Sequence, residues 1–337
     1  MSSSLTWTGR KVLVTGADGF IGSHLAEALV ERGAQVTALA LYNSFDGHGW
    51  LDEIDPARRG AMRLARGDIR DPDQMRALAK GQDAIFHLAA LIAIPFSYEA
   101  PSSFVQTNVQ GTLNVLSAAR DAGVGRVVHT STSEVYGTAR FTPITEEHPL
   151  QGQSPYSASK AAGDLMAEAF HRSFGVPVVT LRPFNTFGPR QSERAVISAI
   201  VRQAIDPRCA EIRLGDLTPK RDFNFVADTV EAFLAVAGLA ESHGGQVFNA
   251  GSGVMVSIKD VLDRIVAATG CKKPVVHEDI RVRPADSEVM ALMAASDKLT
   301  AATGWKSRVA LDEGLARTVD WWRPRLDRVR DDARFLT

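Results

Sequence analysis

Two side chains near the middle of the sequence have the types and the spacing of a general base and the cation that assists it. Tyr156 and Lys160 stand four residues apart in the segment YSASKAAGDLMAEAF. A helix over this segment places both side chains on one face. An ammonium group beside a tyrosine hydroxyl favours the phenolate and lowers its pKa, which produces a base able to work near neutral pH.

A cluster of hydroxyl and carboxyl groups precedes this pair. The segment GRVVHTSTSEVYG, residues 125–137, begins with the pattern of a buried strand and ends in Ser131, Thr132, Ser133 and Glu134. A carboxylate at this place is either a solvated group at a strand end or a catalytic acid or base. Ser131 is either a helper in that chemistry or a hydrogen-bonded serine of the core.

Glycines mark the element that would hold a cofactor beside these groups. KVLVTG predicts a first strand, and TGADGFIG places Gly16, Gly19 and Gly22 at the opening of a helix that Gly33 ends. Glycine permits the tight turn, lets the backbone approach a pyrophosphate and allows the helix to pack closely on the strand. The helix N-terminus favours the negative phosphates. The pattern therefore predicts a dinucleotide site rather than an ordinary glycine-rich turn.

The end of the second strand bears on which dinucleotide is bound. An acidic residue usually holds the ribose 2′-hydroxyl of NAD at that place. This chain has Ala40 and Leu41 there, followed by Tyr42, Asn43 and Ser44. No arginine stands there to receive the 2′-phosphate of NADP either. The sequence favours NAD and does not exclude NADP.

The elements that must position these residues predict an α/β fold. β-Branched runs alternate with amphipathic helical patterns, which is typical of a Rossmann-type, doubly wound parallel sheet. Further strands are expected at AQVTALAL, MRLARGDI, DAIFHLAA, GRVVHTST, VPVVTLRPFN and QVFNAGS. The alternation loosens after residue 180, and FVADTVEAFLAVAGLAE with QVFNAG predicts a helix and strand that return to the sheet. We predict a dinucleotide-binding domain of residues 1–180 plus 224–257 and a smaller mixed α/β domain of residues 181–223 plus 258–337.

Composition excludes several classes of partner. A formal net charge of −1 over 337 residues offers no attraction to nucleic acid or to an acidic membrane. There is no signal-peptide pattern, and no apolar run approaches the roughly 20 residues that a membrane span requires. We therefore expect a cytoplasmic protein. Cys209 and Cys271 form no CxxC pair and the histidines lack ligand spacing, so we predict neither a disulfide nor a metal.

The chain resembles the extended short-chain dehydrogenase/reductases of the nucleotide-sugar epimerase and dehydratase group. The resemblance covers nearly the whole length, through TGADGFIG, GDIRD, HLAA, TNVQGT, YSASK, RPFNTFGPR and RPAD. It implies a nucleotide-sugar substrate bound by the second domain. It also implies a homodimer in which the helices of VQTNVQGTLNVLSAAR and YSASKAAGDLMAEAF form a four-helix bundle.

The resemblance also implies binding residues. Asp68 and Ile69 would flank the adenine of the cofactor, and Tyr156 and Lys160 would serve its nicotinamide end. The cofactor-binding set is Gly16, Asp18, Gly19, Phe20, Ile21, Gly22, Asn43, Ser44, Asp68, Ile69, Leu88, Ala89, Ala90, Thr130, Tyr156, Lys160 and Pro183. The substrate-binding set is Ile94, Thr132, Ser133, Asn185, Arg190, Arg221 and Arg283. The planar fork of arginine suits phosphates, although a single arginine more often forms a surface or structural ion pair.

The triplet Thr132, Ser133 and Glu134 discriminates between reactions within this group. It resembles the triplet of sugar 4,6-dehydratases and uronic-acid decarboxylases, whereas simple epimerases usually lack the acid. Oxidation at C4 of the sugar acidifies the C5 proton, so Glu134 would remove that proton while the C6 hydroxyl leaves as water, assisted by Ser133. Tyr156 would take the C4 hydroxyl proton, and Thr132 would hold the C4 oxygen.

The loops around these residues suggest the sugar. LYNSFDGHGWLDEI, LAALIAIPFSYEAP and TSTSEVYGTARFTPITEEHPLQGQSPYSASK are most similar to dehydratases of legionaminic-acid pathways, which act on nucleotide-linked N-acetylglucosamine. We therefore expect a 4,6-dehydratase of UDP- or GDP-N-acetylglucosamine. The apolar loop of residues 92–98 would lie against the sugar.

Three alternatives remain open at this point. A UDP-glucuronic acid decarboxylase would need a cation near the sugar carboxylate, and residues 92–98 contain none. A C4 epimerase would leave Glu134 without a role. A nucleotide-binding regulator could share the fold without turnover, since a fold does not imply an activity. Trp321 and Trp322, near a helix end, are expected to cap the smaller domain.

Overall fold

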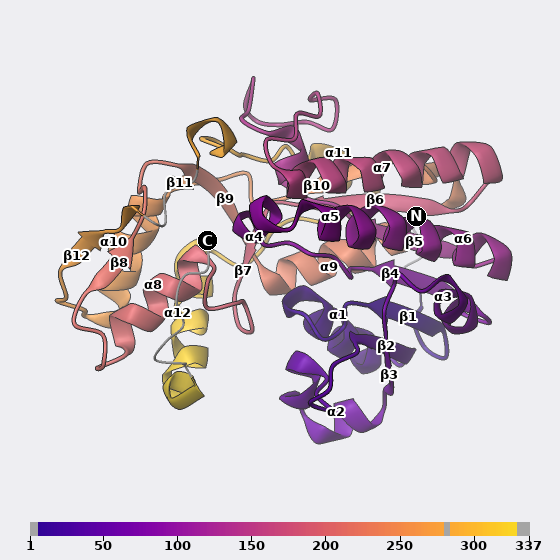
Figure 1. Cartoon of the computed structure of the whole chain (residues 1–337), viewed down its shortest axis with the longest axis horizontal. Helices are drawn as coiled ribbons and strands as arrows, with labels where there is room; N and C mark the ends of the chain where they lie inside the picture. Colours follow the sequence, from indigo (N-terminus) through magenta and orange to yellow (C-terminus); the bar gives the residue numbers. More distant parts are fainter. Residues whose placement is uncertain (1–5, 280–283, 329–337) are drawn as a thin grey trace.

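The centre of the protein is a seven-stranded sheet, seen in a computed structural model that describes residues 6–279 and 284–328 (Figure 1). The strand order is β10-β6-β5-β4-β1-β2-β3, and every neighbouring pair is parallel. The strands are β1 Lys11–Thr15, β2 Gln35–Leu41, β3 Arg63–Gly67, β4 Ala84–His87, β5 Arg126–Thr130, β6 Val178–Pro183 and β10 Val247–Ala250. Each was predicted from the sequence. The order reverses between β1 and β4, where doubly wound sheets bind their ligands.

Helices cover both faces of this sheet, which is why the central strands β4, β1 and β5 are buried along almost their whole length. One layer consists of α3 (Pro72–Ala79), α6 (Gly111–Ala122) and α7 (Pro155–Phe174), and Figure 1 shows α6 and α7 side by side. The other contains α1 (Phe20–Glu31) and α9 (Val226–Ala237), which contact one another. This arrangement is the Rossmann-type α/β fold that the sequence predicted.

Two smaller sheets form the left part of Figure 1. One has the order β11-β9-β7, with β9 antiparallel to β11 and parallel to β7, and the other pairs β8 with β12. Three helices pack together against them around a second apolar core. The elements are β7 Asn185–Phe187, β8 Ile212–Leu214, β9 Lys220–Phe225, β11 Met255–Ser257, β12 Val275–His277, α8 Val196–Ile205, α10 Ile258–Thr269 and α12 Leu311–Trp322. The helix α9 and strand β10 return to the large sheet, while the division into two domains at the stated residues stays a prediction.

Short helices join these parts. They are α2 Pro56–Gly60, α4 Ile94–Glu99, α5 Pro101–Phe104 and α11 Asp297–Thr303, a π-helical turn Val105–Gln110, and 3-10 turns at Gly49–Asp52, Ser133–Tyr136, Glu241–His243, Ala285–Ser287 and Arg323–Arg328. Within the described ranges, no helix is long and apolar enough to cross a membrane. The same residues contain no cluster of three side chains suited to a metal ion. Cys209 and Cys271 are free thiols.

A buried ionic cluster ties α7 to β5 and β6. Asp164 accepts hydrogen bonds from Ser131 Oγ at 2.7 Å and Arg182 Nε at 2.9 Å, and His129 Nε2 lies 3.2 Å from its other oxygen. Arg182 Nη1 also donates to the Tyr136 hydroxyl at 2.8 Å. Burial alone would raise the pKa of Asp164, but the contacts with His129, Arg182 and Ser131 lower it below its ordinary value. The cluster therefore holds a charged carboxylate inside the protein.

Removing that carboxylate charge should destabilise the fold strongly. We expect Asp164→Asn to lower the free energy of unfolding by about 3–5 kcal/mol, because it leaves the buried Arg182 guanidinium uncompensated. The matched control is Asp73→Asn, which breaks an exposed pair with Arg76 and should cost less than about 1 kcal/mol. Urea denaturation followed by circular dichroism measures both. Equal, small losses in the two variants would contradict the prediction.

Candidate active site

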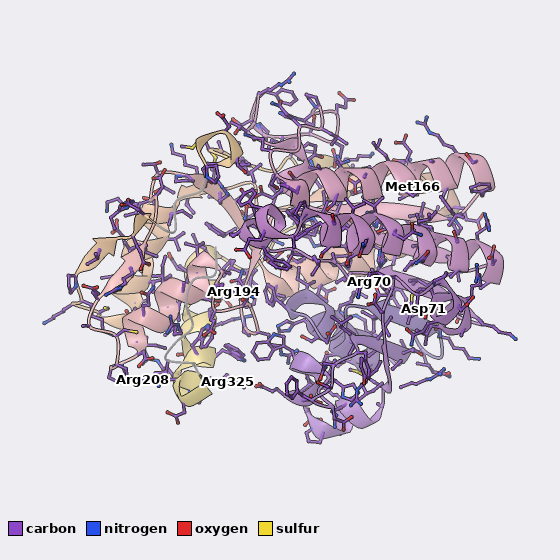
Figure 2. The ribbon with its side chains drawn as sticks, in the orientation of Figure 1. Arg70, Asp71, Met166, Arg194, Arg208 and Arg325 are labelled. Atoms are coloured by element: carbon purple, nitrogen blue, oxygen red, sulfur yellow. The ribbon has the colours of Figure 1, made fainter. Side chains whose placement is uncertain are left out.

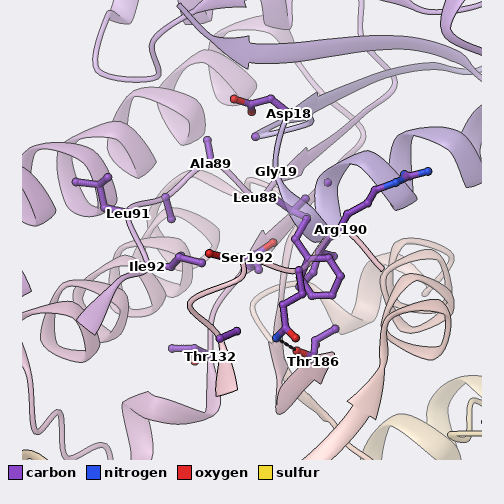
Figure 3. A pocket seen from close by; sticks show the side chains of 18 of the residues that line it. Asp18, Gly19, Leu88, Ala89, Leu91, Ile92, Thr132, Thr186, Arg190 and Ser192 are labelled. Carbon is purple, nitrogen blue, oxygen red and sulfur yellow. Dashed lines mark hydrogen bonds between the residues drawn. The ribbon is translucent and has the colours of Figure 1, made fainter. Parts of the chain in front are cut away.

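A cavity of about 1130 Å³ lies at the carboxyl ends of the central strands. Figure 3 shows Asp18 at one end of it and Thr132 at the other, with Ala89 between them. The sequence-predicted residues that line it are Gly16, Asp18, Gly19, Phe20, Ile21, Gly22, Asp68, Ile69, Leu88, Ala89, Ala90, Ile94, Thr130, Thr132, Ser133, Glu134, Tyr156, Pro183, Asn185 and Arg190. The fold thus gathers residues from distant motifs into one site, and their individual roles stay predictions.

The glycine loop packs backbone against backbone. Gly16 has a φ of +69°, and a Cβ there would lie 2.7 Å from the backbone nitrogen of Ala89. A Cβ on Gly22 would lie 2.1 Å from the carbonyl oxygen of Gly16. Side chains at these positions would push α1 away from the sheet. The backbone N–H groups at the N-terminus of α1 therefore face the cavity without side chains in front of them, as binding of a pyrophosphate requires.

A chain of buried hydrogen bonds holds the end of β4 against this loop. The hydroxyl of Thr15 accepts from the backbone N–H groups of Leu88 and Ala89, and it lies 2.9 Å from His87 Nδ1. His87 Nε2 lies 3.0 Å from the hydroxyl of Thr112, which donates to a backbone carbonyl at 2.7 Å. His87 therefore carries its proton on Nε2 and accepts at Nδ1. Burial lowers the pKa of His87 well below its ordinary value, so the imidazole stays neutral.

The hydroxyl and carboxyl groups after β5 have different surroundings. Ser131 donates to the buried Asp164, which favours its interpretation as a hydrogen-bonded serine of the core. Thr132 begins the 3-10 turn and accepts from the backbone N–H of Glu134 at 3.2 Å. Among the described residues, the Glu134 carboxylate has neither an ion pair nor a hydrogen bond with another side chain. Its oxygens are therefore available to a molecule in the cavity.

Tyr156 lies in the first turn of α7, which begins with a capping box formed by Ser154 and Ser157. The tyrosine ring meets Phe104 edge to face at 6.3 Å. Burial raises the pKa of the Tyr156 hydroxyl above its ordinary value, while a hydrogen bond with Thr132 acts in the opposite direction. The sequence-based expectation of a lowered pKa is therefore not met in the structure, because desolvation outweighs the favourable contacts.

Lys160 lies one turn further along α7, where it faces the interior. Its Nζ donates to the backbone oxygen of Thr130 at 2.5 Å, and the side chain does not line the cavity. Burial lowers the pKa of Lys160 to about 8, and the nearby charge of Asp164 acts against this change. The Lys160 ammonium thus binds the last residue of β5 on the side away from the cavity.

Two buried oxygen atoms in the cavity wall lack partners. Thr130 Oγ1 and Asn185 Oδ1 have no hydrogen-bond partner among the described residues, and both residues line the cavity. Buried polar atoms are rarely left unpaired in native proteins. These two oxygen atoms, at the end of β5 and the start of β7, therefore fit a ligand that donates hydrogen bonds to both.

The predicted phosphate-binding arginines differ in position. Arg190 lines the cavity, but its Nη1 pairs with Glu27 Oε2 at 2.5 Å, and Figure 3 shows its side chain reaching toward α1. Arg221 lies away from the cavity and donates to Glu288 Oε1 at 2.9 Å. Arg283 lies outside the described residues. Arg190 and Arg221 thus both form ion pairs within the protein, which fits a structural role better than phosphate binding.

Two further predicted cofactor residues lie outside the cavity lining. Asn43 closes its own loop, because Nδ2 donates to Gly47 O at 2.9 Å and Oδ1 accepts from the Phe45 backbone N–H at 3.1 Å. Ser44 is exposed on the same loop. Local turn hydrogen bonds explain why these polar side chains do not face the site.

The sequence did not indicate one group of cavity residues. The ring of Trp321 meets Trp50 at 5.4 Å, and the Arg325 guanidinium lies 4.5 Å above Trp321 and 3.6 Å from Glu53. All of them line the cavity, and Figure 2 shows Arg325 beside α12. The expectation that the tryptophans only cap the smaller domain is incomplete, because Trp321 also contacts the loop after β2. No local pattern links two segments so far apart in sequence.

Comparisons with known proteins agree with this fold. Residues 13–318 match the family model described as GDP-mannose 4,6 dehydratase. A UDP-glucose 4-epimerase of Mycolicibacterium smegmatis is 34% identical over 320 residues, which cover 93% of this chain and 98% of that protein. The structure of DesIV, a dTDP-glucose 4,6-dehydratase from Streptomyces venezuelae with NAD and TYD bound, has a TM-score of 0.82 at 31% identity over 94% of this chain and 97% of that one. TunA, an NAD-dependent NDP-hexosamine 5,6-dehydratase involved in tunicamycin biosynthesis, has a TM-score of 0.80 at 29% identity over 94% of this chain and 99% of that one.

The lowered pKa of Lys160 should appear in the pH dependence of stability. The ordinary lysine pKa is 10.5 and the folded value is about 8, so between these values the unfolded chain binds a proton that the folded chain releases. Stability should therefore rise with pH in this window. We expect the free energy of unfolding of the wild type, relative to Lys160→Met, to increase by about 1.5 kcal/mol between pH 8 and 9.5. Urea denaturation of cofactor-free protein measures this, and a pH-independent difference would contradict it.

Proposed function

The chain belongs to the GDP-mannose 4,6-dehydratase family of extended short-chain dehydrogenase/reductases, and on this premise we propose that it is a nucleotide-sugar 4,6-dehydratase. The substrate we propose is UDP- or GDP-N-acetylglucosamine, and the product is the 4-keto-6-deoxy sugar. The observation that carries the proposal is the unpaired Glu134 carboxylate, which lines the same cavity as Thr132 and Tyr156.

The cofactor is NAD, which is bound in the structure of the relative DesIV. The residues of this chain fit it, because Gly16 and Gly22 let the glycine loop pack closely on the neighbouring backbone, which leaves the N-terminus of α1 facing the cavity without side chains in the way. The partnerless Thr130 Oγ1 adds an acceptor in the same wall. When bound, NAD takes a hydride from the sugar and later returns it.

The residues of this chain would move the protons. As C4 is oxidised to a ketone, Tyr156 would accept the proton of the C4 hydroxyl as its phenolate, a form that the positive charge of a bound nicotinamide would favour against the effect of burial. Thr132, which lines the same cavity, would hold the C4 oxygen. The ketone acidifies the neighbouring C5 proton, which Glu134 removes. Glu134 then gives a proton to the departing C6 hydroxyl, so water leaves and a C5–C6 double bond forms. Return of the hydride to C6 and addition of a proton from solvent at C5 would complete the product.

Charge in the cavity favours this reaction over decarboxylation of a uronic acid. Among the described lining residues, each arginine already faces a carboxylate: Arg70 with Asp68, Arg190 with Glu27, and Arg325 with Glu53. A uronic-acid carboxylate would need a cation of its own. A decarboxylase therefore ranks below a dehydratase.

A C4 epimerase is the second candidate, favoured by the identity to the epimerase of M. smegmatis. It requires the oxidation and reduction steps at C4 but no base at C5. Glu134 would then have no role, although its carboxylate is available to a ligand. This leaves the dehydratase as the better account of the site.

The proposed sugar is supported by the cavity wall formed by α4 and the residues just before it. Ile92 is 67% exposed and Phe96 is 41% exposed, although both are apolar and line the cavity. Such side chains suit the methyl group of an acetamido sugar better than a charged substituent. A place in a legionaminic-acid pathway stays a prediction.

We also propose a homodimer through α6 and α7. Figure 2 shows Met166 along α7, and on the same helix Leu165 is 58% exposed. Val105, just before α6, is 56% exposed. Large apolar side chains in adjoining positions are typical of a surface that a partner covers.

The substrate proposal is tested by incubating the protein with UDP- and, separately, GDP-N-acetylglucosamine in deuterated water. We expect one of them to yield a 4-keto-6-deoxy product that carries solvent deuterium at C5, because the original C5 proton leaves with the C6 hydroxyl and the new one comes from solvent. NMR and mass spectrometry detect both features. Conversion to the C4 epimer without deuterium at C5 would support the epimerase, and loss of carbon dioxide from UDP-glucuronic acid would support the decarboxylase.

The roles of the two proton-transfer residues can be separated in a single turnover. We expect Glu134→Gln to lower kcat by about 10²–10⁴-fold while NADH still forms on mixing with substrate, since C4 oxidation does not need Glu134. Tyr156→Phe, the matched variant, should form neither NADH nor product. Stopped-flow absorbance of NADH distinguishes them. Normal turnover in Glu134→Gln would remove Glu134 from the mechanism, and absence of turnover in the wild type would favour a regulator.

A further inference from the structure

The second strand lacks the acid that usually holds the adenosine ribose. Ala40 is fully buried and Leu41, the last residue of β2, carries an apolar side chain. The polar residues that follow, Asn43 and Ser44, do not line the cavity. The strand itself therefore supplies no carboxylate at the place where a dinucleotide-binding fold needs one.

A carboxylate from another element lies at that place. Asp18, within the glycine loop, lines the cavity, and its Oδ2 accepts a hydrogen bond from the backbone N–H of Leu41 at 3.2 Å. This bond fixes the carboxylate at the carboxyl end of β2. In Figure 3 the Asp18 side chain lies at the end of the cavity remote from Thr132, which is the end expected to hold adenosine rather than nicotinamide.

The charges nearby leave this carboxylate unneutralised. Within residues 6–279 and 284–328, no lysine or arginine forms an ion pair with Asp18. Burial raises the pKa of Asp18, while the backbone hydrogen bond from Leu41 and the nearby His48 act in the opposite direction and favour the charged form. The arginines at the end of β3 are engaged elsewhere, because Arg66 pairs with Asp46 and Arg70 pairs with Asp68. A carboxylate has about four acceptor positions, so Asp18 can accept from a ligand as well as from Leu41.

We propose that Asp18 replaces the missing acid of β2, accepts a hydrogen bond from the ribose 2′-hydroxyl of NAD, and excludes the 2′-phosphate of NADP by charge repulsion. The inference rests on the dinucleotide site of the proposed function and deepens it by naming the residue that selects the cofactor. Selection of NAD over NADP then depends on the glycine loop, which in this proposal contacts both the pyrophosphate and the adenosine ribose.

The variant Asp18→Asn tests this with little change in shape. Its side-chain oxygen can still accept from the Leu41 N–H, whereas the negative charge is gone. The control is Glu193→Gln, which removes a carboxylate from the same cavity, in the loop after β7. Isothermal titration calorimetry of the cofactor-free full-length chain gives the Kd of NAD and of NADP for each protein, and thermal melting verifies that each is folded.

We expect the wild type to bind NAD at least about 10-fold more tightly than NADP, a difference of about 1.4 kcal/mol. In Asp18→Asn this ratio should fall by about 10-fold or more, with NADP binding more tightly than it does to the wild type. Glu193→Gln should keep the wild-type ratio.

Other results would overturn the proposal. An unchanged ratio in Asp18→Asn, or equal shifts in the two variants, would remove Asp18 from cofactor selection while leaving the proposed function intact. A wild type that binds neither dinucleotide would overturn the proposed function as well. The two failures are therefore distinguishable.

Discussion

The site depends on the contact of backbone with backbone at the first turn after β1. Gly16 and the end of β4 approach so closely that a single Cβ would collide with Ala89. The buried hydrogen bonds from Thr15 through His87 to Thr112 hold the same strand end from the other side. Because α1, β1 and β4 meet here, this contact fixes the position of the cavity. It also leaves the N-terminus of α1 exposed to a ligand.

The charges behind the site form a second layer of support. Lys160 and Asp164 lie on the same helix as Tyr156, one and two turns further along respectively. Asp164 binds Ser131 and Arg182, and Lys160 binds the carbonyl of Thr130. The helix that presents the tyrosine is thereby fixed to the strands that present Thr132 and Glu134. Burial of these charges is costly, and their mutual pairing offsets that cost.

Local patterns were sufficient to predict the strands of the large sheet and the glycine loop, because apolar periodicity and turn chemistry are local properties. They could not predict that Arg190 pairs with Glu27, since that contact depends on how the loop after β7 folds back over α1. They also could not predict the raised pKa of Tyr156, because desolvation depends on the tertiary packing around its ring. The place of Trp321 beside Trp50 follows from the path of the whole chain.

The contact between the two ends of the chain has a kinetic consequence. Trp50 and Glu53 come from the first quarter of the chain, Trp321 and Arg325 from its last described turn, and an aromatic contact and an ion pair join them along one wall of the cavity. A molecule enclosed there escapes on this side only when both contacts separate together. A reaction that lends a hydride to its cofactor and takes it back within one cycle needs no exchange of that cofactor. Contacts that join distant parts of the chain along the cavity would therefore not slow such a catalyst.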